Sequence, residues 1–227
     1  MAKPPLPPIC STGIEDLDLI LRGGLPRGSL TLLCGGMGSG RTSLCYEFLK
    51  RGVPLGEKGA LLSSMPKKVY QERIPDFDFA GEKPFDGITL VDFVPEDHSD
   101  PETFVQFIEE LVKRINSGRA KRIVVDSMEQ MLQWLPSAVV SRGMRQLQEA
   151  AFRKKVCLIV TAGVMDDAEM HPADVVIDLG MRPVGPDAMR TLEVMRLRGE
   201  MQPLSVYVLS LGKEGALLTR LMEGQDD

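Results

Sequence analysis

The sequence predicts an α/β protein with a mostly parallel sheet flanked by helices and an antiparallel C-terminal β-meander. Through the first two thirds of the chain, short apolar runs alternate with segments of helical periodicity. The last third holds three strand-like runs with no helix between them. Its 227 residues, 43% hydrophobic and 26% charged, can bury one sizeable core. This composition excludes a disordered chain, a collagen-like fibre and a small disulfide scaffold.

The chain begins with a proline-rich segment, residues 1–10, that we expect to form an extended arm. We expect residues 11–227 to form one nucleotide-binding-type domain, since no linker or internal repeat interrupts them. A short capped helix is broken by glycines and a proline at 23–28. The apolar run 30–34 predicts a buried strand before a glycine cluster, and 43–51 predicts the helix that follows.

The same alternation continues to the end of the chain. A long helix opens at Asp100-Pro101, with Asp100 as N-cap, and a second covers 138–154. The turn 212–215 predicts a hairpin, and the charged segment 75–87 predicts a surface loop. The remaining strands are expected at 60–64, 88–93, 122–126, 156–161, 174–179, 191–197, 204–210 and 216–221.

The strongest motif is a glycine-rich loop between a predicted strand and a predicted helix. It has the length of the Walker A pattern GxxxxGK[ST], in which backbone N–H groups surround phosphate oxygens and a helix N-terminus faces the anion. Thr42 would bind Mg²⁺ through its hydroxyl. A glycine-rich turn without a ligand is the alternative. The expected nucleotide-binding residues are Gly35, Gly36, Met37, Gly38, Ser39, Gly40, Arg41, Thr42 and Ser43.

Two further features refine this reading of the loop. Arg41 stands where the motif has lysine, so the positive charge is kept on a longer, planar and forked group. The run 122–127 resembles a Walker B strand, at whose end Asp126 would hold Mg²⁺ through water. The expected cofactors are therefore ATP or ADP with Mg²⁺, and the expected metal ligands are Thr42 and Asp126.

The runs Ser11–Ile14 and Gly23–Ser29, together with 192–199 near the other end, resemble KaiC-type proteins of the RecA superfamily. The resemblance covers about residues 11–221 and implies a RecA-like P-loop fold. It also implies a ring or filament, a homo-oligomer in which Arg196 and Arg198 reach the phosphate site of the neighbouring subunit. A charged edge strand without that role is the alternative.

One feature of hydrolysing family members is missing. They usually carry one or two glutamates after the second strand, where a carboxylate polarises the attacking water. Here Met65 and Pro66 stand at those positions, while Glu72 and Glu129 lie off the motif. The hypothesis is a nucleotide-binding protein with slow or absent hydrolysis that regulates assembly or partner binding; its catalytic residues stay unknown.

Two alternatives remain open: an active RecA-like ATPase acting on DNA, and a pseudo-ATPase with an empty site that serves as a structural subunit. The segment 156–180 contains acidic residues but no lysine or arginine, which disfavours contact with a nucleic-acid backbone. The net charge of −5 points the same way.

The sequence contains no apolar run of the ~18 residues that a membrane helix needs. The proline-rich N-terminus lacks the apolar core of a secretory signal. We therefore expect a cytoplasmic protein without a membrane span.

Overall fold

The structure is a computed structural model of the 227-residue chain. It describes residues 9–74, 77–92, 100–129, 134–163, 170–184, 186–199 and 205–221.

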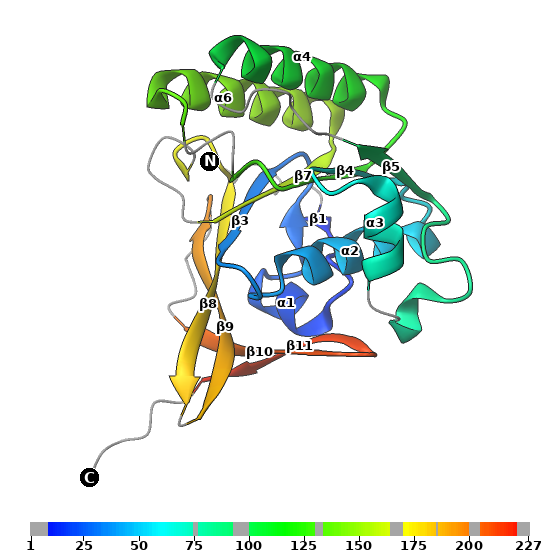
Figure 1. The fold of residues 1–227 in the computed structure, drawn as a ribbon, viewed down its shortest axis with the longest axis vertical. Coiled ribbons are helices and arrows are strands. Elements are labelled where there is room, and N and C mark those ends of the chain that lie inside the picture. The colour runs from blue at the N-terminus through cyan, green and yellow to red at the C-terminus, as the bar shows by residue number, and fades with distance from the viewer. Residues whose placement is uncertain are drawn as a thin grey trace, which may run out of the picture.

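Among these residues, a nine-stranded sheet forms the centre of the molecule (Figure 1), with a two-stranded sheet beside it. The two-stranded sheet pairs β1 (Ile9–Cys10) with β2 (Leu25–Pro26). The order of the large sheet is β11 (Gly215–Arg220), β10 (Val206–Gly212), β9 (Asp187–Leu197), β8 (Val175–Val184), β3 (Leu30–Gly35), β7 (Cys157–Ala162), β6 (Arg122–Asp126), β4 (Gly59–Ser63) and β5 (Ile88–Asp92).

Strands β8, β3, β7, β6, β4 and β5 run parallel to one another, whereas β9, β10 and β11 continue the sheet as antiparallel neighbours. This topology confirms the predicted fold class. In Figure 1, the β8–β9 hairpin extends well beyond the rest of the sheet.

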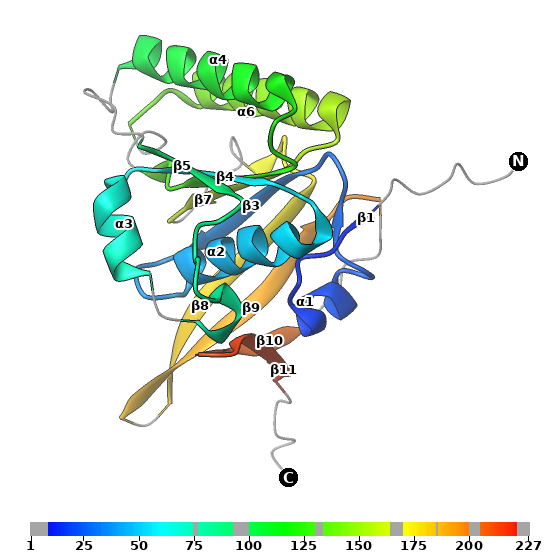
Figure 2. The same cartoon turned by 90° about the vertical axis from the view of Figure 1, so that its right-hand side faces the viewer.

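Helices cover both faces of the sheet, as Figures 1 and 2 show from two directions. Helices α4 and α6 lie together on one face, and α2 lies on the other with α1 and α3 near it. No helix in the described part of the chain is long and apolar enough to cross a membrane. The helices are α1 (Glu15–Ile20), α2 (Arg41–Gly52), α3 (Lys67–Arg73), α4 (Pro101–Ser117) and α6 (Ser137–Lys154), with short 3-10 turns η1 (Val53–Leu55) and η2 (Asp78–Ala80).

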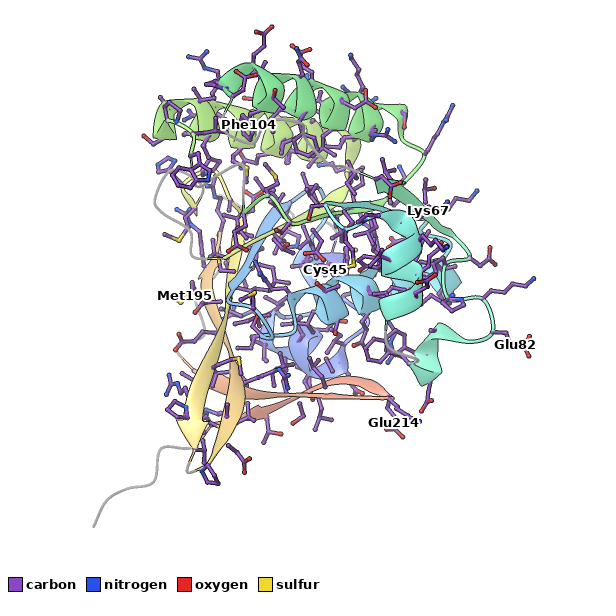
Figure 3. All side chains as sticks on the ribbon, in the orientation of Figure 1. Cys45, Lys67, Glu82, Phe104, Met195 and Glu214 are labelled. Atoms are coloured by element: carbon purple, nitrogen blue, oxygen red, sulfur yellow. The ribbon has the colours of Figure 1, made fainter. Side chains whose placement is uncertain are left out.

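Alternating side chains of the central strands supply two separate cores. On β3, Leu32 packs with α4 and α6, whereas Leu33 packs with α1 and α2, because successive side chains of a strand point to opposite faces. Figure 3 shows Phe104 beneath α4 and Cys45 at the centre of the molecule, on α2. Both side chains are fully buried. Buried side chains therefore pack against both faces of the sheet.

Residues 77–87, the described part of the expected surface loop, pack more tightly than their charges suggest. Phe77 is 7% exposed, and its ring stacks on Tyr46 of α2 at 6.1 Å between centroids. The hydroxyl of Tyr46 also donates to the carbonyl of Pro84 at 2.8 Å. Helix α3 precedes this segment and was not expected. Its Tyr70 is 1% exposed, so burial of one face holds the helix in place.

A buried ion-pair cluster joins α2, β6 and the segment before β4. The Arg122 side chain is fully buried, and its Nε donates to Glu57 Oε2 at 2.7 Å. Its Nη1 donates to the Phe48 carbonyl at 2.7 Å. Arg27 binds the other oxygen of Glu57 at 2.6 Å. One carboxylate thus pairs with two guanidinium groups, one through each of its oxygens.

Two carboxylates bind the outer edge of β11. Glu47 of α2 is 2% exposed and accepts from the Ala216 amide at 2.8 Å. Asp16 of α1 accepts from the Leu218 amide at 2.9 Å. These bonds tie the last strand to the helices beneath the sheet.

Candidate functional site

The glycine-rich loop begins where β3 ends, at the carboxyl edge of the parallel strands. Gly35 has φ +150°, and a Cβ there would lie 2.7 Å from the Leu179 carbonyl oxygen. Gly40 has φ +103°, and a Cβ there would lie 2.6 Å from Leu211 Cδ1. Only glycine therefore fits at these two positions. The loop backbone is held close to β8 and β10.

Several observations show that this loop suits a phosphate chain. No side chain caps the N-terminus of α2, so the backbone N–H groups of its first turn lack intrahelical partners. The helix dipole favours an anion at the same point. Ser39 Oγ is buried with no hydrogen-bond partner, and nothing lies within 4 Å of an added Cβ at Gly36. The loop thus offers unused donors and open space.

Thr42 and Asp126, the two expected metal ligands, lie together. Thr42 Oγ1 donates to Asp126 Oδ2 at 2.9 Å, and Thr161 Oγ1 donates to Asp126 Oδ1 at 2.7 Å. Mg²⁺ prefers oxygen ligands and usually takes one or two carboxylates together with waters and substrate phosphates. This donor set fits such an ion. Within the described ranges, no group of three or more His, Cys, Asp or Glu side chains could hold a metal.

Arg41 forms an ion pair that the sequence motifs did not indicate. Its Nη1 and Nη2 donate to the same oxygen, Oε2 of Glu129, at 3.2 and 3.3 Å. The Arg41 side chain is 12% exposed and that of Glu129 is 47% exposed. The only signal in the sequence is an acid three residues after Asp126. The contact of Glu129 with the loop depends on how β6 and β3 are placed in the sheet.

The end of β4 lies beside the end of β6, since Ser63 pairs with Asp126. Met65 and Pro66 follow directly, and Pro66 precedes the first turn of α3. The Lys67 amide of that turn donates to the Asp92 carboxylate at the end of β5. The stretch from Ser63 to Pro66 therefore brings no carboxylate to the site.

Two other ionisable groups near Asp126 are poor proton acceptors. Burial, and then the charge of Asp126, raises the pKa of the Cys45 thiol well above its usual value. Burial likewise raises the pKa of Tyr70, and Asp126 raises it further. Both groups stay protonated at neutral pH, so neither replaces the missing carboxylate.

Arg190 of β9 contacts the loop and was not singled out from the sequence. Its Nε donates to the Gly38 carbonyl at 2.8 Å. A Cβ on Gly38 would lie 4.0 Å from Met181 Sδ of β8. The β8–β9 hairpin thus reaches its own glycine-rich loop.

Arg196 and Arg198 lie at the opposite end of the sheet. Arg196 Nη1 donates to the carbonyls of Met170 and His171 at 2.8 and 3.2 Å. Arg198 Nη2 donates to the His171 carbonyl at 3.1 Å. The Arg198 amide donates to the carbonyl of Asp174. The amide of Asp174 in turn donates to the carbonyl of Leu30, at the start of β3. Neither arginine is brought to the loop that follows β3 in the same chain.

Comparison with known proteins identifies the family of the chain. The family model for the KaiC ATPase matches residues 10–221. The chain belongs to the KaiC ATPase family. Circadian clock protein KaiC2 of Synechocystis is 32% identical over 227 residues, an alignment that covers 91% of this chain and 39% of KaiC2. A UPF0273 protein of Pyrococcus horikoshii is 24% identical, with 91% of this chain and 92% of that protein aligned.

A solved structure shows the same fold. The crystal structure of a KaiC-like protein from Pyrococcus horikoshii superimposes with a TM-score of 0.75 at 24% identity, covering 95% of this chain and 100% of that one. This KaiC-like chain spans about two fifths of the KaiC proteins it matches and about nine tenths of the UPF0273 proteins. Family membership implies nucleotide binding.

Proposed function

We propose that this KaiC-family domain binds an adenine nucleotide with Mg²⁺ and hydrolyses it slowly or not at all. The glycine-rich loop and the first turn of α2, residues 35–43, would hold the phosphates. Thr42 and Asp126 would hold the ion, which supplies charge neutralisation for the phosphate oxygens when bound. Nucleotide binding, rather than turnover, would then control assembly or the binding of a partner.

The observation that carries this proposal is the contrast between the two halves of the site. The hydrogen bond between Thr42 and Asp126 and the uncapped first turn of α2 support binding of an ion and phosphates at the loop. The end of β4, however, offers Met65 and Pro66, and neither side chain can accept a proton from water. The residues that would bind the nucleotide are therefore kept, whereas the group that would polarise water is replaced.

Calorimetric titration of the full chain with Mg-ADP and Mg-ATP tests the proposal. We expect saturable heat and a flat baseline after each injection. Asp126→Asn should weaken binding at least about tenfold in Mg²⁺ and have little effect in EDTA, because it removes one charged ligand. The exposed Asp86→Asn, which removes the same charge from a surface loop, should bind as the wild type does.

Each contrary outcome points to one alternative. A persistent power offset, with several turnovers per minute in a steady-state assay, would refute slow hydrolysis and favour an active ATPase. Absence of heat at two temperatures would refute binding and favour a structural pseudo-ATPase. A band shift with single-stranded DNA at low salt would favour the DNA-acting alternative. Asp166, Asp167 and Glu169, which argue against DNA, lie outside the described residues.

We further propose that Arg196 and Arg198 act on the phosphate site of a neighbouring copy. Their place at the far end of the sheet supports this, because contact with a phosphate would then require another subunit. Such a head-to-tail contact generates rings or filaments. The double change Arg196→Ala and Arg198→Ala should abolish nucleotide-dependent self-association in sedimentation, whereas Arg145→Ala on α6 should not. Unchanged self-association of the double variant would refute this role.

A further inference from the structure

The Glu129 carboxylate lies at a junction of three parts of the site. Its Oε2 accepts from both terminal nitrogens of Arg41. Its Oε1 lies against Gly163, where an added Cβ would approach to 2.4 Å. The Gly163 carbonyl in turn accepts from the Gly35 amide at 3.0 Å. The carboxylate is therefore placed between the start of the glycine-rich loop, its basic residue and the segment after β7.

The backbone just before Glu129 is held by the end of β7. The amide of Met128 donates to the Thr161 carbonyl at 3.0 Å, which ties the residue before Glu129 to the end of β7. The hydroxyl of Thr161 donates to Asp126. Glu129 thus belongs to the same hydrogen-bonded layer as the expected metal ligands. Two carboxylates approach the loop from the same side: Asp126 at the end of β6 and Glu129 three residues after it.

This arrangement affects the phosphates of a nucleotide unequally. In a loop of this kind, backbone N–H groups hold the α- and β-phosphates, and the basic residue reaches the β- and γ-phosphates. No side chain caps the first turn of α2, so its backbone N–H groups can hold two phosphates. Arg41, in contrast, is already bound to a carboxylate. A third phosphate would have to separate that ion pair and lie beside the negative charge of Glu129, and like charges in close contact oppose binding.

We infer that Glu129 makes this site selective for a nucleoside diphosphate over a nucleoside triphosphate. The inference rests on the proposed function, and it adds which form of the nucleotide the domain holds. Glu129 is in this view a specificity-determining residue that acts through Arg41 and through its own charge. The inference also gives Arg41 a role: its two terminal nitrogens together bind one oxygen of Glu129 and hold that carboxylate beside the loop.

Calorimetric titration with two ligands tests the inference. The ligands are Mg-ADP and the magnesium complex of adenylyl imidodiphosphate, a triphosphate analogue that resists hydrolysis. We expect wild-type protein to prefer the diphosphate by about tenfold or more, since one uncompensated charge decides the difference. Glu129→Gln should reduce that preference to within about threefold, mainly by tightening triphosphate binding. Glu110→Gln, which removes a charge from the surface ion pair with Arg114, should keep the wild-type preference.

The outcomes separate this inference from the proposed function. Equal affinity of the wild type for both ligands would overturn the inference while leaving nucleotide binding intact. An equal change in the affinities for both ligands in Glu129→Gln would also overturn the inference, because an ion pair with a purely structural role would affect both ligands alike. If folded wild-type protein, checked by circular dichroism, binds neither ligand, the proposed function fails and the inference fails with it.

Discussion

The buried cluster around Glu57 allows a quantitative test of how this fold is stabilised. We predict that Glu57→Gln lowers the free energy of unfolding by about 3 to 5 kcal/mol, because removing one partner leaves a buried charge without compensation. The Arg122 side chain is 0% exposed and lies 2.7 Å from Glu57. Arg27 loses the same partner. Total stabilities are only about 5 to 15 kcal/mol, so the loss is a large share.

Urea unfolding followed by far-ultraviolet circular dichroism measures this effect. With a slope of about 2 to 3 kcal/mol/M, the midpoint should fall by about 1 to 2.5 M. Tryptophan fluorescence is less suitable, because Trp134 is 66% exposed in the folded state. The control is Glu110→Gln, whose ion pair with Arg114 lies on the surface and should contribute at most about 1 kcal/mol. A shift for Glu57→Gln no larger than that of the control would refute the argument.

The same carboxylate predicts a pH dependence. Burial alone would raise the pKa of Glu57, but hydrogen bonds from Arg122 and Arg27 hold that pKa below its ordinary value of 4.5. The ionised form is therefore favoured in the folded protein. Its contribution is fully present above pH 4.5 and is lost as the pH falls through the lower folded value. The difference between wild type and Glu57→Gln should be constant near pH 7 and shrink below 4.5.

Two further substitutions address packing and the loop. Gly52→Ala should destabilise the protein by about 1 to 3 kcal/mol in urea unfolding, because its Cβ would lie 2.3 Å from Nε of Arg122. Gly212→Ala, with open space around the added Cβ, should change stability little, and equal effects of the two would contradict this. Arg190→Gln should weaken Mg-ADP binding about threefold to tenfold, because it removes the hydrogen bond to Gly38 that supports the loop. Calorimetry showing unchanged affinity would assign Arg190 a purely local role.

Much of the fold follows from local signals in the sequence. The strand β3 is an apolar run next to glycines, and α4 begins where Asp100 accepts from the amides of Glu102 and Thr103. Helix α3 lacked such signals, since its sequence is largely polar and no side chain caps it. It depends on the burial of Tyr70, which is a tertiary contact.

The residues of the candidate site likewise divide into those that a local motif predicts and those that only the fold brings together. The loop and Asp126 belong to motifs with fixed spacing, so their positions could be predicted. Glu129 and Arg190 could not, because they reach the loop across 88 and 152 residues of sequence. Those contacts depend on the order of β3, β7 and β6 and on the register of the β8–β9 hairpin. No local pattern encodes either property.

The carboxylates on the outer edge of β11 restrict how copies of this protein can associate. An exposed strand edge is a template on which a strand from another chain can add. Here Glu47 and Asp16 already accept from two outward amides, at Ala216 and Leu218. An incoming strand would have to displace both charged acceptors, and Glu47 would then remain buried without its amide partner. Continuation of the sheet beyond β11 is therefore opposed, and copies that associate at this edge would have to do so through side-chain surfaces.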